Sequence, residues 1–122
     1  MKPDISILYD ILKTWASNEE PRSYKDLSHD YHNRTQEWHE PHGSWDEPLG
    51  ELNKILANAG APAISAMVIL KGKNEPGGNF WGCAPNVPAK PKDEIERISE
   101  WSKIVKTVCT YPWPSEIPKP NA

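Results

Sequence analysis

The chain has 122 residues, of which 37% are hydrophobic and 25% are charged, and its formal net charge at pH 7 is −3. This length suits a single domain with one hydrophobic core, and no stretch is apolar over the length that a membrane-spanning helix needs. Nucleic-acid-binding proteins usually carry an excess of basic residues, so the overall charge argues mildly against DNA as a partner, and local charge has to decide.

The amino-terminal sequence Met1-Lys2-Pro3-Asp4 lacks the basic and then apolar layout of a secretory signal. A cytoplasmic location is therefore expected, with no membrane partner. The two cysteines, Cys83 and Cys109, lie far apart in sequence, and nothing places them in an oxidising compartment. We expect both to be reduced thiols.

Three helices are predicted in the first half of the chain. Apolar residues recur at helical spacing from Ile5 to Trp15, and Pro21 ends that helix. A short second helix is expected to begin after Ser23, which can cap it. The segment SWDEPLGELNKILANAGAP, residues 44–62, has a leucine stripe and a terminal Gly60, so it predicts the third helix.

The pattern changes after the third helix. The segment AISAMVIL, residues 63–70, is a short apolar run that is typical of a buried strand. Turn-forming residues follow, ending in Pro76-Gly77-Gly78, and Phe80-Trp81 is expected to begin a returning strand. Together these segments predict a β-hairpin with a polar, glycine-rich tip.

A last helix and an extended tail complete the chain. From Asp93, apolar residues lie at helical spacing and are expected to face the core: Ile95, Ile98, Trp101, Val105 and Val108. The tail, residues 111–122, has four prolines, so it should run extended, with Trp113 packed back on the domain. Residues 1–110 are thus expected to form one domain, followed by a proline-rich tail.

The order of elements indicates an α/β chain of the α+β kind, with a winged-helix-like layout. The segment from Tyr24 to Trp81 resembles the small winged-helix domains of bacterial and phage proteins, and its layout is similar to the C-terminal half of alkyltransferase-like DNA-repair proteins. Those enzymes carry a proline-cysteine-histidine-arginine nucleophile motif. The matching place here reads Ala61-Pro62-Ala63-Ile64-Ser65, so the resemblance implies a fold and no alkyl transfer.

A small basic patch is the feature that points to nucleic acid. The tip of the predicted hairpin and the segment before and within the last helix supply candidate phosphate contacts, namely Lys71, Lys73, Asn74, Lys90, Lys92 and Arg97. The alternative is that these are ordinary solvated side chains. The third helix is a poor reader of DNA because Asp46, Glu47 and Glu51 lie at its start.

All four histidines fall in one short segment, as two His-x2-His pairs: His29, His32, His39 and His42. Four imidazoles could complete a tetrahedral zinc or nickel site, and if an ion binds, these residues are its expected ligands. Structural zinc sites are dominated by cysteine, however, and neither cysteine here has the spacing of a ligand pair. A polar linker without a metal is the favoured interpretation, and no cofactor is expected.

Six tryptophans are more than a small core easily covers, and tryptophan is enriched at interaction hot spots. Trp38, Trp81, Glu47 and Glu51 are therefore candidate protein-binding residues. The sequence has no arrangement typical of a catalytic triad or a phosphate-binding loop. We expect a non-catalytic accessory or regulatory factor in nucleic-acid transactions, associated with phage or mobile elements, whose partner is nucleic acid or a protein that processes it. Contact is expected through the hairpin tip, which is the wing of a winged-helix layout, and through the tail. The alternatives are a small inhibitor or immunity-type protein and a histidine-rich metal-binding domain.

Overall fold

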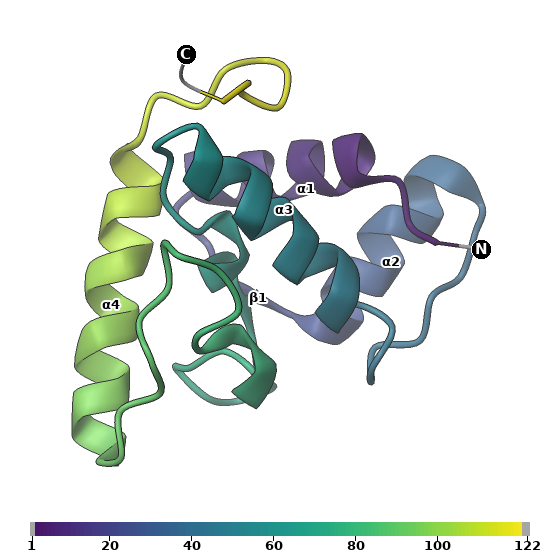
Figure 1. The fold of residues 1–122 in the computed structure, drawn as a ribbon. Coiled ribbons are helices and arrows are strands. Elements are labelled where there is room, and N and C mark those ends of the chain that lie inside the picture. The colour runs from purple at the N-terminus through teal and green to yellow at the C-terminus, as the bar shows by residue number, and fades with distance from the viewer. Residues whose placement is uncertain (1, 121–122) are drawn as a thin grey trace.

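In a computed structural model that describes residues 2–120, four α-helices are combined with one short parallel sheet (Figure 1). This mixed content confirms the expected α+β class. The helices are α1 (Ile5–Ser17), α2 (Tyr24–Thr35), α3 (Asp46–Asn58) and α4 (Glu94–Thr110), the strands are β1 (Arg22–Ser23) and β2 (Val68–Ile69), and two 3-10 turns are η1 (Ile64–Met67) and η2 (Gly78–Phe80).

Polar side chains begin three of the helices, as their sequences predict. The Asp4 carboxylate accepts hydrogen bonds from the backbone N–H groups of Ser6 and Ile7 at the start of α1. Ser23 and Asp26 form a reciprocal capping box at the start of α2. Asp93 accepts from the Glu96 N–H at the start of α4. These bonds satisfy backbone donors that have no partner within a helix.

The predicted β-hairpin is wrong. Strand β2 pairs in parallel with β1, with Arg22 opposite Val68 and Ser23 opposite Ile69, and this pair is the only sheet among the described residues. Most of the apolar run before β2 forms the 3-10 turn η1, while Phe80 lies in a second such turn. The chain that returns after the glycines packs without pairing to β2, and a winged-helix arrangement is not confirmed.

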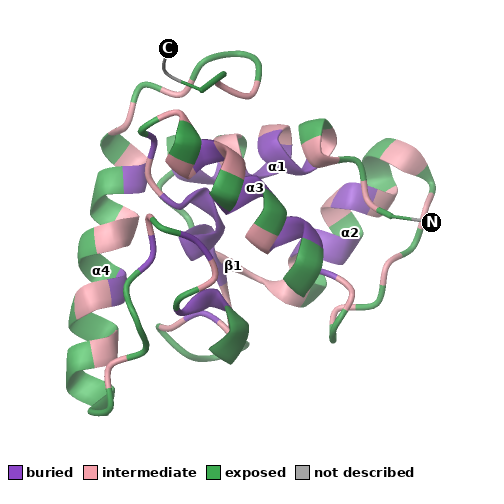
Figure 2. Cartoon of the chain, viewed as in Figure 1, coloured by how far each residue is buried: buried purple, intermediate pink, exposed green. Residues whose placement is uncertain are grey.

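Two adjoining apolar clusters hold the elements together (Figure 2). The larger one joins α1, α2 and α3, and its largest fully buried side chains are Trp45, Tyr9 and Tyr31. The smaller one contains Phe80, Trp81 and Trp101. Trp81 is only 9% exposed, so the expectation that it is available to a protein partner is wrong. It belongs to the same buried cluster as Trp101 of α4, and its ring packs edge-on against Phe80.

Helix α4 stands at the edge of the molecule and packs on it mainly through its carboxy-terminal half (Figure 1). The indole N–H of Trp101 donates a 2.8 Å hydrogen bond to the Ala66 carbonyl, and Val108 is fully buried. In contrast, Ile95 is 77% exposed and Ile98 is 38% exposed. The sequence predicted both isoleucines on the inner face, but Arg97, Trp101 and Val108 form the face that meets the body, and Ile98 and Ile95 lie to one side of it.

The proline-rich tail returns to the body, as predicted from its tryptophan. The Trp113 indole N–H donates a 2.8 Å hydrogen bond to the Val108 carbonyl, and its ring packs edge-on against Tyr9. Tyr111, Trp113 and Ile117 are partly buried against the larger cluster. No helix within residues 2–120 has the length and apolar character that crossing a membrane requires.

Candidate nucleic-acid interface

Arg97 joins the two segments that carry the predicted basic residues. Its guanidinium lies 3.6 Å from the Glu75 carboxylate, in the loop after β2, and both side chains are about four-fifths buried. The same guanidinium donates hydrogen bonds to the carbonyls of Pro91 and Lys92, at 3.3 and 3.0 Å. In this structure the Arg97 guanidinium is mostly buried and held by protein groups, so we treat Arg97 as a positioning residue for the neighbouring lysines, and its expected contact with phosphate stays a prediction.

The lysines around this ion pair are exposed. Lys71, Lys73 and Asn74 lie on the loop after β2, and Lys90 and Lys92 lie on the segment that leads into α4. Because Glu75 and Lys92 both contact Arg97, the two segments meet at one edge of the molecule. We refer to Lys71, Lys73, Lys90 and Lys92 as the basic edge.

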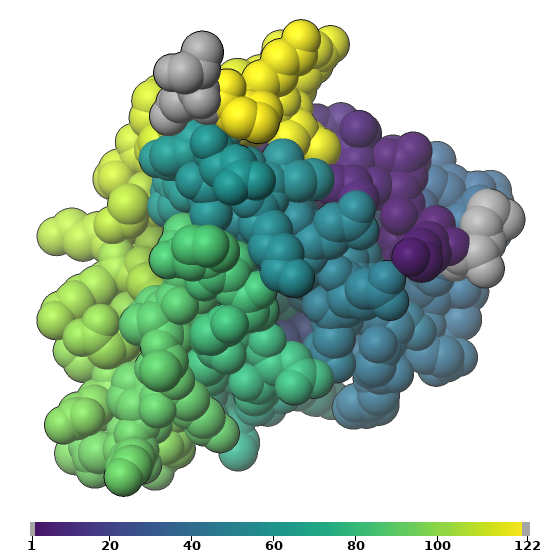
Figure 3. Space-filling model, in the orientation of Figure 1, coloured from purple at the N-terminus to yellow at the C-terminus, as the bar shows by residue number. Residues whose placement is uncertain are grey.

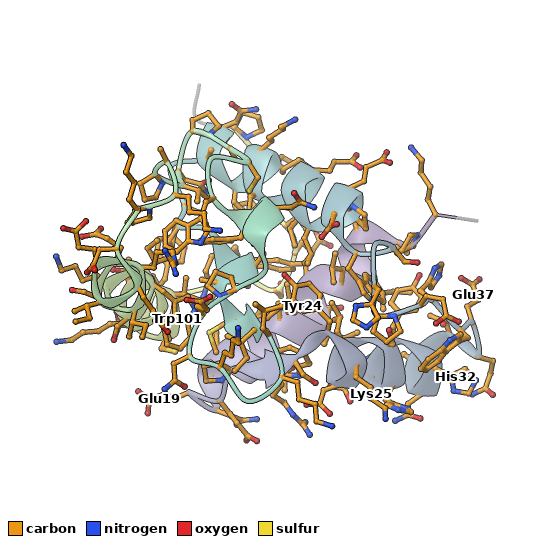
Figure 4. The ribbon with its side chains drawn as sticks, turned by 90° about the horizontal axis from the view of Figure 1, so that it is seen from below. Glu19, Tyr24, Lys25, His32, Glu37 and Trp101 are labelled. Carbon is orange, nitrogen blue, oxygen red and sulfur yellow. The ribbon has the colours of Figure 1, made fainter. Side chains whose placement is uncertain are left out.

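The parallel sheet adds a lysine that the sequence did not single out. Ser23 lies opposite Ile69 in the register, and both strands run in the same direction. Lys25, two residues beyond Ser23, therefore leaves the same end of the sheet as Lys71, two residues beyond Ile69. Lys25 is exposed in the first turn of α2, next to Tyr24 (Figure 4). Only the unpredicted pairing of β1 with β2 could have indicated this proximity.

Residues 70–77, which we call the lysine loop, are fixed at their base, whereas residues 71–74 at the tip are exposed. The Gly77 N–H donates a 3.1 Å hydrogen bond to the Tyr24 hydroxyl, and a Cβ at Gly77 would lie 2.7 Å from that oxygen, so a larger residue cannot occupy the position without a shift. Burial raises the pKa of Tyr24 above its ordinary value, so the hydroxyl is neutral when it accepts this hydrogen bond. At the tip, Gly72 adopts a φ of +72°, a conformation that favours glycine.

Acidic residues limit the extent of the basic edge. Asp93, Glu94 and Glu96 are exposed at the start of α4, directly after Lys92. At the start of α3, Asp46 accepts a 2.8 Å hydrogen bond from Asn79 and Glu47 pairs with Lys2 at 2.9 Å. Helix α3 therefore presents carboxylates where a recognition helix presents donors, in agreement with its sequence.

The structure distributes the four histidines among aromatic contacts. The rings of His29 and His32 lie edge-on to Trp38, with ring centroids 5.2 and 6.3 Å from it. His39 packs between Tyr31 and Trp45, and its Nε2 lies 3.5 Å from Glu37. His42 is exposed in the following turn.

The histidines do not form the four-ligand cluster that their spacing allowed. Within residues 2–120 there is no group of three or more His, Cys, Asp or Glu side chains arranged to hold a metal ion. The physical reason is that Trp38 and Trp45 take up the rings of His29, His32 and His39, which directs them toward hydrophobic partners. The conditional assignment of all four as ligands of one ion is not supported by this conformation.

Of the predicted protein-binding residues, three are at the surface. Trp38 is 45% exposed, and its indole N–H donates a 3.0 Å hydrogen bond to Glu40. Glu47 and Glu51 are exposed on α3. Together with the edge-on histidines, this bond fixes the orientation of the Trp38 ring before any partner is present.

A buried polar cluster behind α3 escaped the sequence analysis. The Asn53 amide donates hydrogen bonds to the Ser65 hydroxyl at 2.6 Å and to the Cys83 sulfur at 3.4 Å. The cavity beside it, lined by Ser65 and Cys83, has a volume of only about 10 Å³. Such a space is no larger than one water molecule, so this cluster has a structural role and does not receive a substrate.

Comparisons of the chain with protein-family models, with curated proteins and with solved structures found no match.

Proposed function

We propose that this protein is a non-catalytic accessory or regulatory factor in nucleic-acid transactions that contacts the sugar-phosphate backbone through its basic edge. The observation that carries the proposal is the Glu75–Arg97 ion pair. This pair neutralises the one acid of the lysine loop and holds that loop beside Lys90 and Lys92. Four exposed lysines thereby lie on two adjoining segments, and Lys25 leaves the same end of the sheet as Lys71.

Lysine ammonium groups favour phosphate recognition over base recognition. They act as point charges with rotatable donors, whereas bases are read by the planar or paired donors of Arg, Asn and Gln. On the lysine loop, only Asn74 could add a hydrogen bond to a base. Binding is therefore expected to depend weakly on base sequence and strongly on salt, with a log–log slope of about −4 on duplex DNA if four phosphates are contacted.

A salt titration tests this proposal. The affinity for labelled duplex and single-stranded oligonucleotides is measured by fluorescence anisotropy as the salt concentration is raised. The variant Lys71→Glu plus Lys73→Glu should lose at least tenfold in affinity at low salt. The matched control is Lys54→Glu plus Lys119→Glu, which makes the same change in net charge at two exposed positions outside the basic edge and should weaken binding much less.

Two results would overturn the proposal. One is the absence of binding to either oligonucleotide at low salt. The other is an equal loss of affinity in both double variants, which would mean that total charge, and no particular surface, governs the interaction.

A second candidate function rests on Trp38. An exposed tryptophan whose ring is already oriented loses little conformational entropy on binding, which is a property of interaction hot spots. With the exposed carboxylates at the start of α3, it favours an inhibitor that covers a basic surface of an enzyme. A pull-down from the native host with wild-type protein and with Trp38→Ala tests this function, since only the wild type should retain a nuclease or other nucleic-acid enzyme. The Trp38→Ala variant should bind DNA as the wild type does.

A further inference from the structure

The amino-terminal half of α4 presents an apolar surface that the rest of the chain leaves uncovered. A shallow depression on its solvent side is lined by residues of this helix alone, namely Ile95, Ile98, Ser99, Ser102, Lys103 and Lys106. Ile95 and Ile98 are among the three large hydrophobic side chains that are exposed in the described chain. Figure 4, which looks nearly along α4, shows Trp101 pointing into the body, whereas other side chains spread into solvent on the opposite side.

The spacing of this surface is that of a helix-packing seam. Ile95, Ser99, Ser102 and Lys106 are separated by four, three and four residues, so they form a single stripe along α4. Ile98 lies on one flank of the stripe and Lys103 on the other. The two serines are small, so a second helix can approach closely at the middle of the stripe.

Charges are divided between the two halves of the same helix. The acidic residues Glu94, Glu96 and Glu100 precede or adjoin Trp101, while the lysines Lys103 and Lys106 follow it. Lys103 pairs with Glu100 at 3.2 Å, but its side chain is 71% exposed, so its ammonium is open to a second carboxylate. Arg97 does not offset the acidic half, because its guanidinium is bound to Glu75 inside the protein. The helix is thus negative at its amino-terminal end and positive toward its carboxy-terminal end, and an identical helix in the opposite direction complements it.

We propose that two copies of this chain associate through antiparallel packing of their α4 helices. A two-fold axis midway between Ser99 and Ser102 places Glu96 of one copy near Lys103 of the other: the two residues lie about 7 Å and about 4 Å from the axis along the helix, on opposite sides, and their long side chains can span the difference of about 3 Å. Ile95 then covers the aliphatic stem of the other copy's Lys106. Each contact is made twice, as a two-fold interface requires.

The proposed interface is open on the outer surface of the protein. Side chains of α4 project from one edge of the body in Figure 3, and the loops and helices that bury Trp101 lie on the other side of the helix. Two isoleucines per copy contribute a small apolar area, so the association should be weak and reversible. We expect the transition from monomer to dimer between about 10 µM and about 1 mM, as is typical of interfaces below the standard size.

Sedimentation velocity over this concentration range tests the inference, in the presence of a reductant because Cys83 and Cys109 are free thiols. The wild type should shift from monomer to dimer as its concentration rises. The variant Ile95→Ser plus Ile98→Ser should remain monomeric, and its circular dichroism spectrum should be unchanged because both residues are exposed. A wild type that is monomeric throughout, or a double variant that still dimerises, would overturn the proposal.

Charge reversal tests the antiparallel arrangement separately. Glu96→Lys and Lys103→Glu should each weaken self-association at least fivefold, because each places like charges in contact across the axis. An equimolar mixture of the two variants should dimerise again. In the mixed pair the introduced lysine of one chain meets the introduced glutamate of the other, and the unchanged Lys103 of the first chain meets the unchanged Glu96 of the second. Failure of the mixture to associate, when both variants keep wild-type helicity, would show that this pairing is wrong.

Discussion

The phenol of Tyr9 donates a 2.6 Å hydrogen bond to the carbonyl of Pro114, which joins the first helix to a residue 105 positions later. Lys13, one turn further along α1, donates to the same carbonyl at 3.5 Å and to that of Ser115 at 3.2 Å. Trp113 packs beside the Tyr9 ring. The tail therefore completes the large apolar cluster, and its backbone carbonyls find donors on α1.

Replacing Trp113 by alanine should lower the free energy of unfolding by about 2–3 kcal/mol. Truncating a fully buried large aromatic residue costs about 3–5 kcal/mol, and Trp113 is only partly buried. Chemical denaturation gives the value. Trp38→Ala is the matched control, because it removes the same atoms from an exposed position and should cost less than about 1 kcal/mol. Equal effects of the two substitutions would contradict the docked tail.

The stability of the protein should fall between about pH 10 and pH 12, in part because of Tyr9. Burial, with smaller contributions from Asp10 and Tyr111, raises the pKa of Tyr9 from 10.0 to about 12. In this range the unfolded chain loses the Tyr9 proton and the folded chain keeps it, so unfolding becomes more favourable as the pH rises. Urea denaturation at several pH values should show a weaker decline for Tyr9→Phe. If the wild type and Tyr9→Phe lost stability equally over this pH range, the Tyr9 hydroxyl would not have a raised pKa in the folded protein.

Ser28→Ala should destabilise the protein by about 1–3 kcal/mol, although it removes a single oxygen atom. The Ser28 hydroxyl donates to the His39 carbonyl at 2.5 Å and accepts from the indole N–H of Trp45 at 2.9 Å, and both Ser28 and Trp45 are fully buried. Without it, a buried donor loses its partner. Thr14→Ala is a useful control, because that hydroxyl bonds to the preceding turn of its own helix at an exposed position. If thermal melts showed that Thr14→Ala destabilises the protein more than Ser28→Ala does, the stabilising role of the buried Ser28 hydroxyl would be disproved.

The helices could be predicted because each carries several independent signals. The apolar stripe of α1, the Ser23 cap of α2 and the terminal glycine after α3 all agree with the structure. The sheet could not be predicted, because β1 contains only Arg22 and Ser23 and two residues carry no detectable period. The short apolar run 63–70 is typical of a buried strand, and residues 63–68 are indeed buried. A 3-10 turn in the interior, such as η1, needs the same apolar residues, so composition does not distinguish the two.

The candidate site shows the limit of reading charge from sequence. Lys71, Lys73, Lys90 and Lys92 were correctly expected at the surface, where lysine usually lies. Arg97 was grouped with them because all five are basic. Its partner Glu75 lies in a loop 22 residues earlier in the sequence. The residues around Arg97 do not indicate this pairing. The inward prediction for Ile95 failed for a related reason, since apolar periodicity does not reveal that a charged residue, Arg97, faces the body in the first turns of α4.

Arg97 should support nucleic-acid binding without touching the nucleic acid, and Arg97→Met tests this role. The variant keeps the aliphatic stem but loses the ion pair with Glu75 and two hydrogen bonds to carbonyls. Because the Glu75 carboxylate would remain mostly buried without a cation, the free energy of unfolding should fall by about 2–3 kcal/mol. Denaturation in urea measures that loss.

The salt dependence of DNA binding separates positioning by Arg97 from direct contact. Removing a phosphate contact reduces the log–log salt slope by about 0.9, which is the result expected for Lys73→Ala. Arg97→Met should weaken binding, because the lysine loop is no longer held beside Lys92, but its slope should match that of the wild type. A slope reduced as much as that of Lys73→Ala would mean that Arg97 leaves Glu75 and reaches phosphate itself, in which case the ion pair that carries the proposed function opens on binding.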